Sequence, residues 1–87
     1  MKSIRLYTIM LCPYCIQLKE LLDNEGIKYI EINVDSEVGG IEFASIQKVA
    51  KSDMLPMVIV GNKVLVPDIG FRTILECFEI ILKLMGK

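Results

Sequence analysis

The chain has 87 residues, a length that supports one hydrophobic core and not two, so we expect a single domain over residues 1–87. Ten basic and eleven acidic side chains, spread without a block of like charge, give a formal net charge of -1, which disfavours nucleic acid as a partner. Hydrophobic residues make up 53% of the chain. Charges nevertheless interrupt every apolar stretch before the roughly 18 residues that a membrane span needs, so we expect no membrane segment.

The cysteine content and the first residues bear on the cellular compartment. Three cysteines are an odd number, whereas a secreted scaffold held by disulfides normally pairs all of its cysteines. The first eight residues, MKSIRLYT, alternate polar and apolar side chains and lack the continuous apolar block of a secretory signal. We therefore expect a cytoplasmic protein, in which a CxxC pair is more often catalytic or metal-binding than a structural disulfide.

The first half of the chain has the pattern of a strand, a helix and a second strand. Residues 3–8 alternate with the period of two that is typical of a strand. Residues 13 to about 25 have apolar side chains at helical spacing, with Pro13 suited to the first turn and Gly26 to the position after the end. Residues 28–34 alternate again. Because a helix joins the two strands, we expect them to be parallel.

The second half predicts a helix, a hairpin and a final helix. Residues 57–66, MVIVGNKVLV, place two β-branched runs around Gly61–Asn62, which is typical of a tight hairpin. Residues from about 69 to 85 form an amphipathic pattern with Arg72 on the polar side. A helix from about 39 to 51 would have an inner face of Phe43, Ile46, Val49 and Ala50. The order β-α-β-α-β-β-α fits an α/β fold with a four-stranded mixed sheet flanked by three helices.

The stretch CPYC lies at the predicted junction between the first strand and the first helix. Backbone N–H groups and the helix dipole favour an anion there, and a thiolate is such an anion, so Cys12 is the candidate nucleophile. Cys15 belongs to the apolar stripe one turn into the helix, which suits a resolving thiol. After Cys12 attacks a substrate disulfide, Cys15 can displace the mixed disulfide and leave the pair oxidised.

Metal binding is the competing interpretation of the two cysteines, because a CxxC pair also forms half of a zinc site. The chain has no histidine, and Cys77 is a solitary third thiol. Cys77 lies away from the charged side of the last predicted helix, so we expect it to be buried and inert. A closed site with four ligands would need a carboxylate or a second subunit, so we assign no metal ligand.

The CPYC motif, the element order and Leu55–Pro56 just before the third strand together resemble the glutaredoxin family of the thioredoxin-like fold. The resemblance covers nearly the whole chain and includes LYT before the motif and Lys19 after it. It implies a glutathione-dependent disulfide oxidoreductase, a cis bond between Leu55 and Pro56, and pairing of the Leu55 backbone with an incoming thiol-bearing peptide. The residues implied to shape the substrate and glutathione site are Pro13, Tyr14, Leu55, Pro56 and Asp68.

Two positions depart from the family pattern. Dithiol glutaredoxins usually carry a lysine three residues before the nucleophilic cysteine, whereas this chain has Ile9. After the hairpin, the family has a Gly-Gly segment followed by polar residues that hold the γ-glutamyl end of glutathione, whereas residues 66–70 read VPDIG and keep only Asp68. A lost charge-assisted contact costs about 1.5–3 kcal/mol, so we expect weaker glutathione use, with Lys19 and Lys51 as candidate replacement cations.

Residues 9–11, Ile-Met-Leu, allow two interpretations. Either the first strand continues into the core with Ile9 buried, or the three side chains form an exposed apolar rim beside Cys12. An exposed rim would favour protein disulfides over a small anionic thiol. A chain with such a rim resembles the glutaredoxin-like redoxins that draw electrons from thioredoxin reductase.

We therefore predict a monomeric glutaredoxin-like thiol-disulfide oxidoreductase that reduces protein or glutathione mixed disulfides through Cys12 and Cys15. It has no bound cofactor, takes glutathione as reducing co-substrate, and has disulfide-containing proteins and glutathione reductase or thioredoxin reductase as partners. A redoxin supplied by thioredoxin reductase is the alternative within the same class. A carrier of zinc, or of an iron-sulfur cluster shared by two subunits through Cys12, is the alternative from another class.

Overall fold

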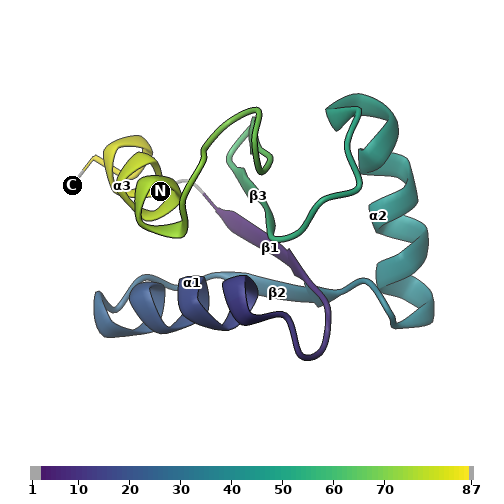
Figure 1. Ribbon diagram of the computed structural model, residues 1–87, viewed down its shortest axis with the longest axis horizontal. Helices are drawn as coiled ribbons and strands as arrows, with labels where there is room; N and C mark the ends of the chain where they lie inside the picture. The colour runs from purple at the N-terminus through teal and green to yellow at the C-terminus, as the bar shows by residue number, and fades with distance from the viewer. Residues whose placement is uncertain (1–2, 87) are drawn as a thin grey trace.

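The computed structural model describes residues 3–86 and confirms the predicted α/β fold (Figure 1). The sheet order is β2-β1-β3-β4, with β1 parallel to β2 and antiparallel to β3, and β3 antiparallel to β4. None of the helices in these residues is long and apolar enough to cross a membrane. The elements are β1 (Ile4–Thr8), α1 (Pro13–Asn24), β2 (Ile30–Asn33), α2 (Glu37–Ala50), β3 (Met57–Val60), β4 (Lys63–Leu65) and α3 (Ile74–Leu84).

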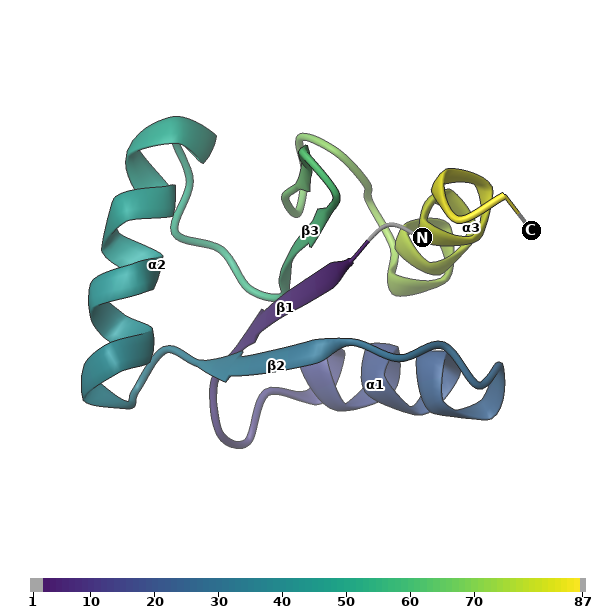
Figure 2. The same ribbon diagram turned by 180° about the vertical axis from the view of Figure 1, so that it is seen from behind.

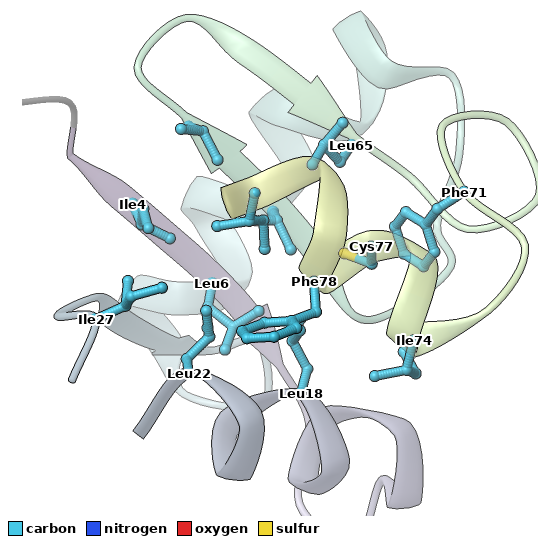
Figure 3. Close-up of a cluster of buried hydrophobic side chains, with 13 residues drawn as sticks. Ile4, Leu6, Leu18, Leu22, Ile27, Leu65, Phe71, Ile74, Cys77 and Phe78 are labelled. Atoms are coloured by element: carbon cyan, nitrogen blue, oxygen red, sulfur yellow. The ribbon is translucent and has the colours of Figure 1, made fainter. Parts of the chain in front are cut away.

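The larger part of the core lies between the sheet and the two helices α1 and α3. Leu18 and Leu22 of α1 and Phe78 of α3 point toward one another and toward β1 (Figure 3). Since fully burying one leucine or phenylalanine contributes about 1.5–3 kcal/mol, these contacts hold the start of α1 firmly against the sheet. The buried members of this cluster are Ile4, Leu6, Leu18, Leu22, Ile27, Val58, Val60, Leu65, Phe71, Ile74, Cys77, Phe78 and Ile81.

Helix α2 covers the opposite face of the sheet, so that α2 and α3 lie on different sides in both views (Figures 1 and 2). Its Phe43 packs against Tyr7, with ring centroids 6.1 Å apart, and Glu42 accepts a hydrogen bond from the Tyr7 hydroxyl at 2.7 Å. The predicted inner face is confirmed at Phe43 and wrong at Val49, which is 76% exposed. Because only one narrow stripe of α2 contacts the sheet, Val49 faces solvent beyond it.

Helix α2 begins two residues earlier than predicted, with Gly39 inside its first turn. The Ser36 hydroxyl caps the helix by accepting the Gly39 N–H at 2.9 Å, which is the usual role of serine at this position. A Cβ at residue 39 would lie 2.0 Å from the Asn33 carbonyl oxygen. The glycine is therefore required by the close approach of the helix to the end of β2 and does not mark the start of the helix.

Helix α3 begins five residues later than predicted, at Ile74. The Gly70 N–H donates to the Val66 carbonyl at 2.7 Å and the Asp68 N–H to the Phe71 carbonyl at 2.7 Å, so this segment is a tight turn. Thr73 then caps the helix by accepting the N–H of Glu76 at 3.0 Å. Arg72, predicted on the polar side of the helix, precedes its first turn instead.

The hairpin before this turn is confirmed. Its strands β3 and β4 pair in register from Val58 with Leu65 to Val60 with Lys63. Gly61 in the connecting turn has φ of 62°, a value that glycine adopts without strain. The hairpin places residues 66–73 at the end of the sheet, next to the start of α1.

Candidate active site

The two cysteines lie at the junction of β1 and α1, as predicted. Cys12 is the N-cap residue of α1, with an extended backbone, and Pro13 takes the first helical position. The Cys12 Sγ accepts the N–H of Cys15 at 3.2 Å. This sulfur therefore takes the place that a serine or aspartate oxygen takes in an ordinary helix cap, where the N–H groups and the helix dipole favour negative charge. The arrangement places the Cys12 sulfur where the helix offers an N–H donor and the positive end of its dipole.

Cys15 is buried, with 1% of its surface exposed, and belongs to the inner face of α1 with Leu18. Burial raises the pKa of the Cys15 thiol to about 12, and the neighbouring Cys12 sulfur acts in the same direction. A backbone hydrogen bond at Ile9 and the positive charge of Lys19 both lower this pKa. The pair is thus asymmetric, since the Cys12 sulfur caps the helix and the Cys15 sulfur is buried with a raised pKa.

A cleft of about 530 Å³ lies between the first turns of α1, the segment before β3 and the segment that leads into α3. The Leu55–Pro56 bond that borders it is cis, as the resemblance implies. Neither cysteine lines the cleft, but Tyr14, which lies between them in the chain, does. Among the predicted site residues, the cleft brings together Tyr14, Leu55, Pro56 and Asp68. Its lining is Tyr14, Gln17, Met54, Leu55, Pro56, Pro67, Asp68, Phe71, Arg72, Thr73, Ile74 and Leu75.

The cation that lines the cleft is Arg72, which is not among the predicted site residues. Lys19 and Lys51, the candidate replacements for the lysine missing at Ile9, do not line it. The Lys19 Nζ instead lies 2.9 Å from the Glu31 carboxylate, and Lys51 ends α2. Sequence spacing missed Arg72 because it assigned this residue to the exposed side of a helix.

A polar cluster beside α1 was also missed. The buried Thr8 hydroxyl donates to Glu31 Oε2 at 2.8 Å, and Lys19 donates to the same oxygen at 2.9 Å. These hydrogen bonds, that of Lys19 first, outweigh partial burial and lower the pKa of the Glu31 carboxyl. Glu31 occupies a polar position of the alternating stretch 28–34, so its charge fits the pattern, and no local signal indicates its pairing with Thr8 and Lys19.

The apolar rim at residues 9–11 is exposed. Leu11 is 86% exposed and Met10 72%, while Ile9 is 37% exposed. The interpretation that continues the first strand into the core with Ile9 buried is therefore wrong, since β1 ends at Thr8 and Ile9 is exposed. The rim precedes Cys12 directly.

Two further points concern the third cysteine and metal binding. Cys77 is fully buried in the α3 core, as predicted, and burial raises its pKa to about 12. Within residues 3–86 there is no cluster of three or more His, Cys, Asp or Glu side chains arranged to hold a metal ion.

Comparison with known proteins points to one family. The glutaredoxin family model matches residues 4–65. Glutaredoxin 1 of Rickettsia typhi is 35% identical over 60 residues, which cover 69% of this chain and 58% of the relative. The glutaredoxin of Pseudomonas aeruginosa is 36% identical over 63 residues, 71% of each chain. The matched part spans between 58% and 63% of the length of four rickettsial relatives.

Solved structures agree in fold. A glutaredoxin from Archaeoglobus fulgidus superposes with a TM-score of 0.72 at 22% identity, covering 100% of this chain and 89% of that one. The NrdH-redoxin of Escherichia coli, described as a glutaredoxin-like protein with a thioredoxin-like activity profile, gives 0.62 at 30% identity, covering 74% and 80%. A buckwheat glutaredoxin–glutathione complex gives 0.65 at 23% identity, covering 75% and 60%. With its family match over residues 4–65 and this thioredoxin-like fold, the chain belongs to the glutaredoxin family.

Proposed function

We propose that the protein is a glutathione-dependent thiol-disulfide oxidoreductase that reduces protein or glutathione mixed disulfides. The observation that carries the proposal is the asymmetric cysteine pair: Cys12 caps α1 with its sulfur on the Cys15 N–H, and Cys15 is buried one turn further on. The proposal assigns the protein, acting as a monomer, to the reducing cytoplasm, where such a pair is regenerated after each turnover.

In the first step, the Cys12 thiolate attacks one sulfur of the substrate disulfide. A bond forms between Cys12 and that sulfur, and the other substrate sulfur leaves as a thiolate. In the second step, Cys15 loses its proton and attacks Cys12 Sγ, which releases the second substrate thiolate and leaves the Cys12–Cys15 disulfide. The substrate gains the two electrons that the cysteine pair loses.

The mixed disulfide prepares the second step. While Cys12 carries negative charge, it helps to keep the Cys15 pKa high. Once Cys12 is joined to substrate, its sulfur is uncharged, and this contribution disappears. Cys15 therefore becomes easier to deprotonate only after substrate is attached.

Two glutathione molecules restore the dithiol. The first thiolate opens the Cys12–Cys15 disulfide and becomes attached to Cys12, and the second attacks the bound glutathione sulfur and leaves with it as glutathione disulfide. The cleft is wide enough for part of a tripeptide, and its Asp68 and Arg72 offer one charge of each sign. The buckwheat relative solved with glutathione supports this choice of thiol. We assign glutathione and substrate contacts to Pro13, Tyr14, Leu55, Pro56 and Asp68.

Thioredoxin reductase is the second candidate electron source. The exposed apolar rim at residues 9–11 offers no cation to a glutathione carboxylate, and the Escherichia coli NrdH-redoxin, with its thioredoxin-like activity profile, is 30% identical to this chain. The first observation favours a reductase that contacts the protein over an apolar surface.

The test is reduction of bis(2-hydroxyethyl) disulfide by the purified protein, coupled either to glutathione and glutathione reductase or to thioredoxin reductase. We expect turnover with glutathione, loss of turnover in Cys12→Ser, and wild-type turnover in the matched control Cys77→Ser. Turnover only with thioredoxin reductase would identify the second candidate. Equal turnover in wild type and Cys12→Ser would refute the mechanism, and stoichiometric zinc or iron lost on alkylation of Cys12 would favour the carrier function.

A further inference from the structure

The apolar rim of Ile9, Met10 and Leu11 exposes more hydrophobic surface than folding requires. Met10 is 72% and Leu11 86% exposed, and residues 9–16 include no charged side chain. Exposed apolar side chains that gather at one place on a protein usually mark an interaction site. Tyr14 and Ile16 in the first turn of α1, and Met54 in the cleft lining, are exposed as well.

Leu11 also has an unfavourable backbone conformation. Its φ is 62°, in the left-handed region, where the Cβ of most residues clashes with the backbone. Gly26 and Gly61 occupy the same region elsewhere in the chain. Leucine at residue 11 therefore stabilises the fold neither through burial nor through its backbone. Residues other than glycine with a strained backbone conformation gather at functional sites.

The position of the rim identifies what covers it. Leu11 directly precedes Cys12 in the chain, so its exposed side chain is attached one residue from the sulfur that a disulfide must reach. Glutathione, with two carboxylates and one ammonium group, gains little from an uncharged leucine. A polypeptide with apolar side chains next to its half-cystine would bury them against Met10 and Leu11.

We propose that Met10 and Leu11 form a docking surface for protein disulfides whose half-cystines are flanked by apolar side chains. The inference rests on the proposed oxidoreductase function and adds the substrate class. Catalysis itself stays with Cys12 and Cys15, and the rim acts by retaining one class of substrate near the nucleophile.

The experiment compares three disulfides: a peptide whose two cysteines are flanked by leucine, the same peptide with serine in place of leucine, and bis(2-hydroxyethyl) disulfide. The variant is Leu11→Asn, because asparagine tolerates a positive φ and lacks the apolar surface. Leu11→Gly is the second variant, since glycine removes both the side chain and the backbone strain. Val38→Ser, at a 75% exposed apolar position on α2, is the matched control.

We expect the wild type and Val38→Ser to prefer the leucine peptide. Both Leu11 variants should lose about tenfold in kcat/KM for that peptide, as expected when one leucine contact is lost, and should retain turnover of the small disulfide. Equal losses on all three disulfides, or no loss on the leucine peptide, would overturn the docking surface. If the wild type reduced none of the three, the oxidoreductase function itself would fail.

Discussion

In the proposed mechanism, the burial of Cys15 makes the second step dependent on pH. Burial, the largest cause, raises the pKa of this thiol to about 12, so the thiolate that must attack Cys12 is scarce near neutral pH. Attachment of a substrate to Cys12 removes only the smaller contribution of that sulfur. Because each pH unit below the pKa changes the thiolate fraction tenfold, the rate of resolution should rise about a hundredfold from pH 6 to pH 8.

Dithiobis(nitrobenzoate) separates the two steps, because each releases one coloured thiolate. With one equivalent of reagent, the first release reports attack by Cys12, and the second reports attack by Cys15 on the mixed disulfide. The second release should accelerate with pH as calculated, and Cys15→Ser should give the first release alone. A second release whose rate is constant from pH 6 to pH 8 would refute the argument that a buried, neutral thiol controls this step.

Three further predictions follow from the described contacts. Thr8→Val removes the hydrogen bond to Glu31 without leaving a buried donor unpaired, so calorimetry should find a loss of about 1 kcal/mol, or a Tm lower by about 4–8 °C. Folding raises the pKa values of Cys15 and Cys77 from 9.0 to about 12, so their contribution to the free energy of unfolding should be complete below pH 9 and should decline as pH rises toward 12. Urea unfolding at increasing pH measures this decline, and a free energy of unfolding that stays constant would contradict it. Lys19→Met removes a charge that lowers the Cys15 pKa, so the second release should slow severalfold at pH 7 while the first is unchanged.

The order of the elements could be predicted from the sequence because each depends on a short-range period. Alternation and helical spacing act over a few residues, and the fold needs only their order and right-handed connections. The start of α3 could not be found in this way. The hydrogen bonds of the turn before it join Gly70 to Val66 and Asp68 to Phe71, and the apolar spacing of these residues continues smoothly into the helix.

The candidate site likewise contains residues that could be predicted from local motifs and residues that could not. Cys12, Cys15 and the cis Pro56 lie in short motifs, so their positions could be predicted from neighbouring residues and the family resemblance. Glu31 and Lys19 are 12 residues apart, on β2 and α1, and meet only because the two elements pack together. A contact that depends on tertiary packing leaves no mark on local spacing, which also explains why Arg72 was assigned to a helix face and not to the cleft.

The residues proposed for the exchange reaction differ from those proposed for the choice of substrate. Cys12 and Cys15 are fixed by a helix cap and by a core that holds α1 through Leu18, so a change that moves either sulfur should affect every disulfide alike. The rim residue Leu11 is fixed by neither, since 86% of its surface is exposed. Its replacement should alter which disulfide reaches Cys12 while the rate of exchange at the sulfur stays the same. If the proposed function and docking surface hold, replacement of Leu11 changes selectivity without cost to the redox reaction, because specificity depends on differences in binding between competing substrates.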